Sequence, residues 1–163
     1  MHSPDAISWY AVKIYAELPR ILKYLQSNGV EIFAPKKDGK PMFGPIIFLR
    51  CTENDLLKVK ADWYHQMVVC RDPEREYPQP IADHEMENFR MVLSAQNQEL
   101  YPLEIYDREF LVGQGVRVTD GPFKGARGVI KRIKGNRRLI VSVCGIVAVA
   151  TSYIPQEFLE SIV

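Results

Sequence analysis

The stretch GVRVTDGPFKGARGVIKRIKG, residues 115–135, decides the fold of the C-terminal part of the chain. Its short apolar runs are separated by Asp120-Gly121, Gly125 and Gly128. The same pattern of short apolar runs continues to residue 149, with further breaks at Gly135-Asn136 and Gly145. Alternating apolar residues indicate half-buried strands, and glycine-rich breaks indicate turns. Residues 113–163 therefore predict a small antiparallel barrel of about five strands.

The glycines and basic residues of this stretch do not predict a nucleotide site. A P-loop places its lysine after the second glycine, followed by Ser or Thr at the mouth of a helix. Here Lys124 precedes Gly125, and the chain runs into a predicted strand. A Rossmann fingerprint would need a surrounding βαβ unit. The glycines shape turns, while the basic side chains either form a solvated face or contact nucleic acid.

The N-terminal part alternates predicted strands with predicted helices. A helix fits the segment between Pro19 and Gly29, because proline suits a first helical turn and glycine a C-terminal stop. Thr52 with Asp55 resembles a capping box before a helix at 53–61, and Asp83 can cap another at 84–95. The predicted strands are 8–15, VEIFAP, 45–51 and HQMVVCR, and KKDGKP is a predicted loop. This order predicts one compact α/β module.

The charge distribution supports two modules. Residues 113–163 carry eight Lys/Arg against three acids, whereas residues 72–109 carry three against ten. Residues 96–112, QNQELYPLEIYDREFLV, show neither helical nor strand periodicity. We therefore expect a first domain over 1–97, a linker over 98–112 and a second domain over 113–163. Modules of such different charge are expected to face different partners.

Composition also narrows the class of protein. A hydrophobic fraction of 47% with 25% charged residues is typical of a globular protein. Because no apolar run approaches membrane-spanning length and no signal core follows the N-terminus, we expect a cytoplasmic protein without membrane contact. The three cysteines and three histidines are too scattered for a metal site, and we expect buried, inert thiols. No nucleophile, carboxylate pair or cofactor motif stands out, so we expect neither an enzyme nor a cofactor.

The segment GVRVTDGPFKGARGVI resembles the KOW motif, which occurs in ribosomal proteins and in transcription elongation factors of the NusG family. The N-terminal segments WYAVKIYAELPRILKYLQ, PIIFLRC and PIADHEMENFRMV, followed by a linker and a KOW barrel, resemble NusG over nearly the entire chain. Within that family, FLR and CGIVAVATSYIP resemble most the UpxY-type antiterminators of Bacteroides-like bacteria, which are associated with surface-polysaccharide operons.

This resemblance implies an α+β fold. An NGN-type α/β sandwich with a mainly antiparallel sheet would be linked to a five-stranded, SH3-like KOW barrel. It also implies a monomer that binds the clamp helices of the largest RNA polymerase subunit and suppresses pausing or termination. An alternative is an RNA-binding or ribosome-associated KOW protein that works through the basic barrel.

The resemblance further implies a polymerase-binding surface around MFGPIIF, residues 42–48. Phe43 takes the aromatic position of the family's apolar turn, and Ile46 takes the position of its tyrosine. Phe48 falls on the same strand face as Ile46 and is either part of this surface or part of the core. One of Trp9 and Tyr10 faces the core and the other is available to extend the surface, for which we name Tyr10.

Other contacts are expected by the same resemblance. Basic residues on the first helix and the following loop are candidates for upstream or non-template DNA, with a solvated surface as the alternative: Arg20, Lys23, Lys36, Lys37 and Lys40. The KOW barrel of general NusG factors recruits Rho or a small-subunit ribosomal protein. The matching candidates are Phe123, Ile146 and Val147, although Ala148 replaces an arginine of the family in this neighbourhood.

Overall fold

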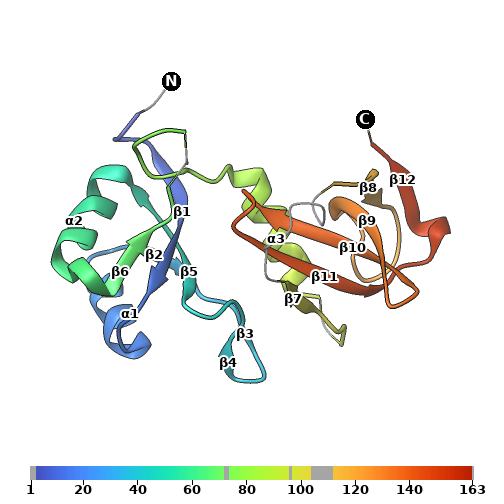
Figure 1. Cartoon of the computed structure of the whole chain (residues 1–163), viewed down its shortest axis with the longest axis horizontal. Helices are drawn as coiled ribbons and strands as arrows, with labels where there is room; N and C mark the ends of the chain where they lie inside the picture. The colour runs from blue at the N-terminus through green and yellow to red at the C-terminus, as the bar shows by residue number, and fades with distance from the viewer. Residues whose placement is uncertain (1–2, 72–73, 96, 104–111, 163) are drawn as a thin grey trace. The chain divides into compact units, whose positions relative to one another are not determined.

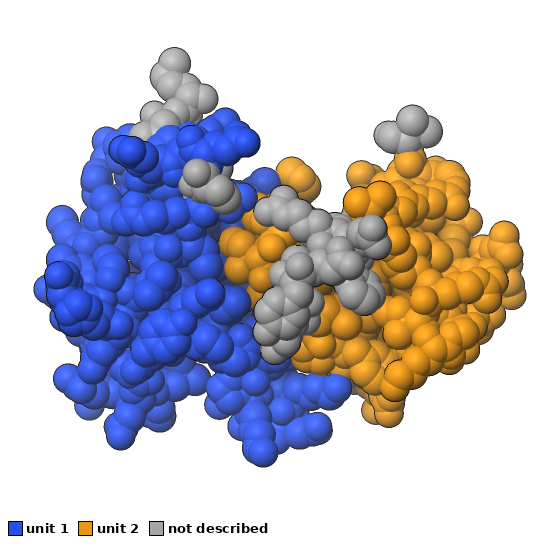
Figure 2. Space-filling model, in the orientation of Figure 1, with its two compact units in different colours: residues 1–83 blue, residues 84–163 orange. Residues whose placement is uncertain are grey.

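A computed structural model of the chain describes residues 3–71, 74–95, 97–103 and 112–162. The fold is mixed α+β with antiparallel sheets (Figure 1). The chain divides into two compact units, Met1–Asp83 and His84–Val163 (Figure 2). This division lies before the boundary expected from the sequence, because residues 84–93 of the last helix group with the second unit.

The first unit is built on a four-stranded sheet in the order β2-β5-β1-β6. The four strands are β1 (Ile7–Ile14), β2 (Glu31–Phe33), β5 (Ile46–Thr52) and β6 (Met67–Val69). All pairings are antiparallel, and β1 and β5 form the centre, with Tyr10 opposite Leu49 and Ala11 opposite Phe48. The strands predicted from the sequence are therefore confirmed within a residue or two at most ends.

Two helices pack on one face of this sheet, α1 (Leu18–Ser27) and α2 (Glu53–Trp63), the latter followed by the 3-10 turn η1 (Tyr64–Gln66). The α1 helix has a proline in its first turn and is followed by Gly29 at φ 72°. In α2 the Thr52 side chain accepts a hydrogen bond from the Asp55 N–H at 3.1 Å, as the sequence predicts. The core between helices and sheet includes Val12, Ile21 and Leu49.

The segment KKDGKP forms a hairpin, which corrects its prediction as a loop. Strands β3 (Lys36–Lys37) and β4 (Lys40–Pro41) pair across Asp38 and Gly39, whose φ angles are 53° and 77°. Two consecutive positive φ angles give the turn that best matches the twist of a hairpin. Figure 1 shows this hairpin extending away from the four-stranded sheet.

The second unit contains a six-stranded antiparallel sheet in the order β12-β8-β9-β10-β11-β7. Its strands are β7 (Tyr101–Leu103), β8 (Gly115–Val118), β9 (Arg127–Ile133), β10 (Asn136–Val143), β11 (Val147–Tyr153) and β12 (Leu159–Ser161). The 3-10 turn η3 (Gln156–Phe158) leads into β12. The five strands after residue 113 agree with the number expected from the sequence.

Strand β7 lies within the segment that the sequence assigned to the linker. Ala148 pairs with Leu103, and Ala150 pairs with Tyr101. Tyr101 and Leu103 pack against an apolar cluster that includes Ile140. Residues 101–103 are therefore part of the sheet, because an alternating aromatic and aliphatic pair covers an apolar strip of β11. The linker residues 104–111 lie outside the described residues.

The third helix, α3 (Asp83–Leu93), is held on the second unit by polar side chains. The Asn88 amide donates to the Arg127 carbonyl and accepts from the Arg127 N–H, both at 2.8 Å. Glu85 accepts a hydrogen bond from the Cys144 N–H at 2.6 Å. Both contacts reach backbone groups of the sheet, so they fix where the helix lies along it.

Candidate partner-binding surfaces

The turn before β5 holds the two central residues of the expected polymerase surface. Phe43 and Ile46 are both half-buried, and the Ile46 N–H donates to the Phe43 carbonyl at 3.2 Å. Gly44 has a φ of 62°, a conformation that glycine adopts without strain. The Ile14 N–H donates to the Pro45 carbonyl at 2.8 Å, which ties the turn to the end of β1. The sheet therefore positions this turn firmly.

Phe48 lies on the same face of β5 as Ile46 but is fully buried. Its ring lies 6.1 Å from the Phe33 ring of the neighbouring strand. Of the two alternatives left by the sequence, the structure supports the core residue. A buried ring of this kind supports the strand beneath a surface rather than forming the surface.

Tyr10 lies on the opposite face of the sheet from Ile46 and Phe48, which corrects its assignment to the polymerase surface. It is paired with Leu49 and belongs to the core beneath α1 and α2. Successive side chains of a strand point to opposite faces. Trp9 therefore shares the face of Ile46 and Phe48, and it is the residue that the sequence could not separate from Tyr10.

The expected nucleic-acid residues lie on two exposed elements. Arg20 and Lys23 are exposed on α1, and the Arg20 guanidinium lies 5.1 Å from the centre of the Trp63 ring. The other three basic residues are exposed on the β3–β4 hairpin: Lys36, Lys37 and Lys40. The structure thus presents all five charges to solvent, as a phosphate contact requires.

Sequence reasoning missed an aromatic site that follows α2. Tyr64 is 63% exposed with a φ of 43°, and its ring centre lies 4.1 Å from that of His65. Tyr15 is 59% exposed, and its N–H donates to the Gln66 carbonyl at 2.8 Å. The three consecutive aromatic residues at 63–65 were a signal, because only Trp63 is needed by the core. Exposed rings beside basic residues are suited to stacking with bases.

The candidates of the second unit differ in exposure. Phe123 and Val147 are both 3% exposed, whereas Ile146 is half-buried in the turn between β10 and β11. Cys144 and Gly145 in this turn have φ angles of 48° and 66°. Both Val147 and Phe123 are therefore buried in the core of the second unit, where a partner protein does not reach them. Ile146 is the accessible candidate.

All three cysteines are free thiols, and burial raises the pKa of each. Burial raises the pKa of Cys51 to about 11, with a smaller contribution from Asp55. Burial and the nearby Glu85 carboxylate raise the pKa of Cys144 to about 12. Since the thiolate is the reactive form, these two side chains are poor nucleophiles at neutral pH, as expected. Cys51 is buried, as expected, whereas Cys70 and Cys144 are half-buried, so the expectation of buried thiols is only partly met for those two.

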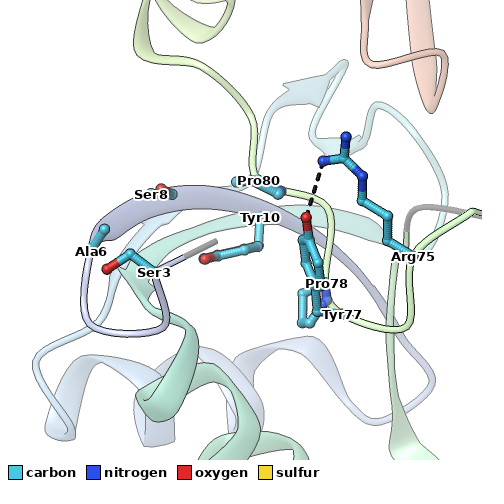
Figure 3. Close-up of a pocket in the computed structure, with 8 residues that line it drawn as sticks. All are labelled: Ser3, Ala6, Ser8, Tyr10, Arg75, Tyr77, Pro78 and Pro80. Carbon is cyan, nitrogen blue, oxygen red and sulfur yellow. Dashed lines mark hydrogen bonds between the residues drawn. The ribbon is translucent and has the colours of Figure 1, made fainter. Parts of the chain in front are cut away.

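A half-open hollow of about 410 Å³ lies at the start of β1 in the first unit (Figure 3). Its lining combines hydroxyl groups with prolines, and Figure 3 shows Tyr10 and Tyr77 pointing into it. The Arg75 guanidinium donates to the Tyr77 hydroxyl at 3.0 Å. The residues that line this hollow do not include a nucleophile paired with a base.

None of the helices in the described part of the chain is long and apolar enough to cross a membrane. The same residues contain no group of three or more His, Cys, Asp or Glu side chains that could hold a metal ion.

The fold of this chain is similar to that of a solved protein. The chain aligns with a structure of NusG from Thermotoga maritima, in which the interaction of that protein's domains was described. The alignment covers 99% of this chain and 100% of that chain, with a TM-score of 0.54 and 19% sequence identity. No protein-family model and no curated protein matches the sequence. The similarity shows that this chain has the NusG fold.

Proposed function

We propose that this protein is a transcription elongation factor that binds RNA polymerase and suppresses pausing or termination. The observation that carries the proposal is a NusG-like fold that extends over both units, not over the KOW-like part alone. An RNA-binding KOW protein would leave the first unit unexplained. The proposed activity is mechanical, since a protein that bridges two sides of the polymerase clamp disfavours the clamp opening that pausing requires.

The proposed polymerase contact is the turn at Phe43 and Ile46, which would meet the clamp helices of the largest subunit. Two half-buried apolar side chains on a turn fixed by hydrogen bonds can enter an apolar groove with little loss of conformational entropy. Phe48 supports the turn from within the sheet. Ile46 lacks a hydroxyl group, so the contact would depend on apolar burial.

We further propose that the exposed basic residues of α1 and the β3–β4 hairpin face upstream or non-template DNA, with Tyr64 and His65 as stacking partners. In the second unit, Ile146 is the proposed contact for Rho, a ribosomal protein or another recruited factor. The narrower proposal is a UpxY-like paralogue that acts as a cytoplasmic monomer on polysaccharide operons. A leader template from such an operon, compared with an unrelated template, would test that specificity.

The polymerase contact is tested with the double variant Phe43→Ala/Ile46→Asp. Wild-type protein should bind core RNA polymerase in an interferometry assay and lengthen transcripts in a pausing assay. The double variant should lose at least about tenfold in affinity, because a charge replaces an apolar contact that must be desolvated. The pause-suppressing effect should weaken in parallel.

A matched control is Leu57→Asp, which changes an apolar side chain that is 39% exposed on α2. This position lies on the helical side of the sheet, away from the turn, so polymerase binding should be unchanged. Equal binding by the double variant and the wild type would show that the surface is misplaced. Absence of any polymerase binding by the wild type would overturn the proposed function itself.

A further inference from the structure

A second hollow, of about 320 Å³, lies in the second unit among residues of strands β8, β9, β10 and β12 and of the segments beside them. Its polar lining consists of Gln114, Arg137, Gln156 and Ser161, and apolar residues of β8, β9 and β12 complete it. This volume is at the lower end of the range of small-ligand sites. The hollow can therefore take a group the size of a phosphate with part of a sugar.

The polar side chains of this hollow are mainly hydrogen-bond donors. Arg137 donates to the Gln156 side-chain oxygen at 3.4 Å, which leaves the Gln156 amide NH₂ directed away from that contact. Gln114 donates to the Ser161 hydroxyl oxygen, so the hydroxyl hydrogen is available for another acceptor. The lining residues include no Asp or Glu. A site with one guanidinium, two amides and a hydroxyl, without a carboxylate, favours an anion.

The hairpin that joins β9 to β10 places like charges directly opposite each other. Arg137 pairs with Arg132, and Arg138 pairs with Lys131. Lys134 lies in the turn of the same hairpin, and residues 131–138 contain no acidic residue. Like charges in directly opposed positions destabilise a sheet. An anion that binds between two such cations neutralises their charge and so removes the repulsion that destabilises the sheet.

The charges of the hairpin occupy two places. Arg132 and Arg137 face each other on the two strands, and Lys134 lies in the turn at the tip, beyond the last strand pair. Arg132 shares the sheet face of Arg137, since the two are directly paired. An anion held in the hollow can therefore contact the Arg137 end, while a further anionic group is needed at the tip. This spacing suits a polymer with a phosphate in each unit.

We propose that the hollow is a phosphate-binding site and that the β9–β10 hairpin extends it to the sugar–phosphate backbone of a single-stranded nucleic acid. Arg137 holds one phosphate with its fork of N–H donors, assisted by Gln114, Gln156 and Ser161. Arg132 and Lys134 meet the neighbouring phosphates. The proposal goes beyond the polymerase contact, because it uses residues of the second unit alone and does not require the polymerase.

The test measures binding of the full-length chain to fluorescent single-stranded RNA and DNA of one mixed sequence, by anisotropy over a range of salt concentrations. Inorganic phosphate and poly-glutamate serve as competitors. Arg137→Gln should weaken strand binding about tenfold. The slope of log affinity against log salt should fall by about 0.7 for each phosphate contact removed. Arg137→Lys should retain the salt slope but part of the affinity should be lost, because lysine lacks the fork.

Lys124→Gln is the matched control, since it removes one exposed cation from the same unit outside the hairpin. Circular dichroism melting curves verify that each variant is folded. Weaker strand binding by Arg137→Gln with unchanged binding by Lys124→Gln supports the site. Equal losses in both variants, binding of inorganic phosphate without strand binding, or binding of poly-glutamate as tight as that of the strand would each overturn the assignment. Because polymerase is absent from this assay, its failure leaves the polymerase proposal unaffected.

Discussion

Gly128 is the second residue of β9, and the backbone of β10 passes directly beside it. An added Cβ would lie 2.3 Å from the Ile140 carbonyl oxygen and 3.1 Å from a methyl group of Leu139. The first of these atoms belongs to the backbone of a central strand and cannot rotate away. A glycine is therefore required at position 128 because two strands approach each other closely there. A positive φ is not the reason at this position.

Replacing Gly128 with alanine should lower the free energy of unfolding by about 1–3 kcal/mol, because the clash must be relieved by moving a strand. Chemical denaturation followed by circular dichroism measures the change. The control is Gly135→Ala, where a Cβ meets nothing within 4 Å but the φ of 81° remains unfavourable for alanine. A smaller loss, about 1–2 kcal/mol, is expected there. A Gly128→Ala variant as stable as the wild type would contradict the close approach.

At the scale of elements, α3 depends on Asn88, whose amide forms two hydrogen bonds with the Arg127 backbone. Asn88→Ala should lower the free energy of unfolding of the second unit by about 1–3 kcal/mol, at roughly 1 kcal/mol for each bond with some allowance for unsatisfied backbone groups. Faster hydrogen exchange of the α3 amides should accompany the loss. Glu87→Ala, an exposed change one residue earlier on the same helix, should leave both measurements unchanged. Unaltered exchange in Asn88→Ala would show that the helix is held by other contacts.

The elements that could be predicted from the sequence are those specified by local chemistry. Thr52 and Asp55 indicated the start of α2 because a capping hydrogen bond spans only three residues. In contrast, β7 is specified by pairing with β11, which lies far later along the chain, and Pro102 in its centre is a residue that disfavours strands. The β3–β4 hairpin was missed because each of its strands is only two residues long.

In the candidate sites too, local sequence predicts some features, whereas others depend on residues that are distant along the chain. The apolar run IIFLRC predicted a central strand, but a strand with apolar residues on both faces does not reveal which of them is covered. Phe48 and Tyr10 therefore could not be assigned before the pairing of β1 with β5 was known. Likewise, Gln114, Gln156 and Ser161 are distant in sequence from Arg137 and carry no motif. Only the sheet order brings them together.

At the scale of the whole molecule, the position of the second domain's boundary decides which fragments are stable. Fragments over 98–163 and 113–163 both lack α3 and differ in residues 98–112, so the first retains β7 and the second exposes the edge of β11. The second also loses the packing of the Tyr101 ring, whose centre lies 4.7 Å from the Arg138 guanidinium, and of Leu103 against the Ile140 cluster. Partial burial of two such side chains stabilises by about 2 kcal/mol.

The shorter fragment should therefore melt roughly 10 °C below the longer one, given the steep dependence of Tm on stability in domains of this size. Because an uncovered edge strand pairs with other copies, it should also self-associate in light-scattering measurements. The fragment 98–163 carrying Tyr101→Ser and Leu103→Ser is the control, and it should resemble the shorter fragment in Tm despite its full length. Identical melting of 98–163 and 113–163 would mean that β7 contributes nothing to the sheet, and that the segment before residue 113 behaves as the linker that its composition suggests.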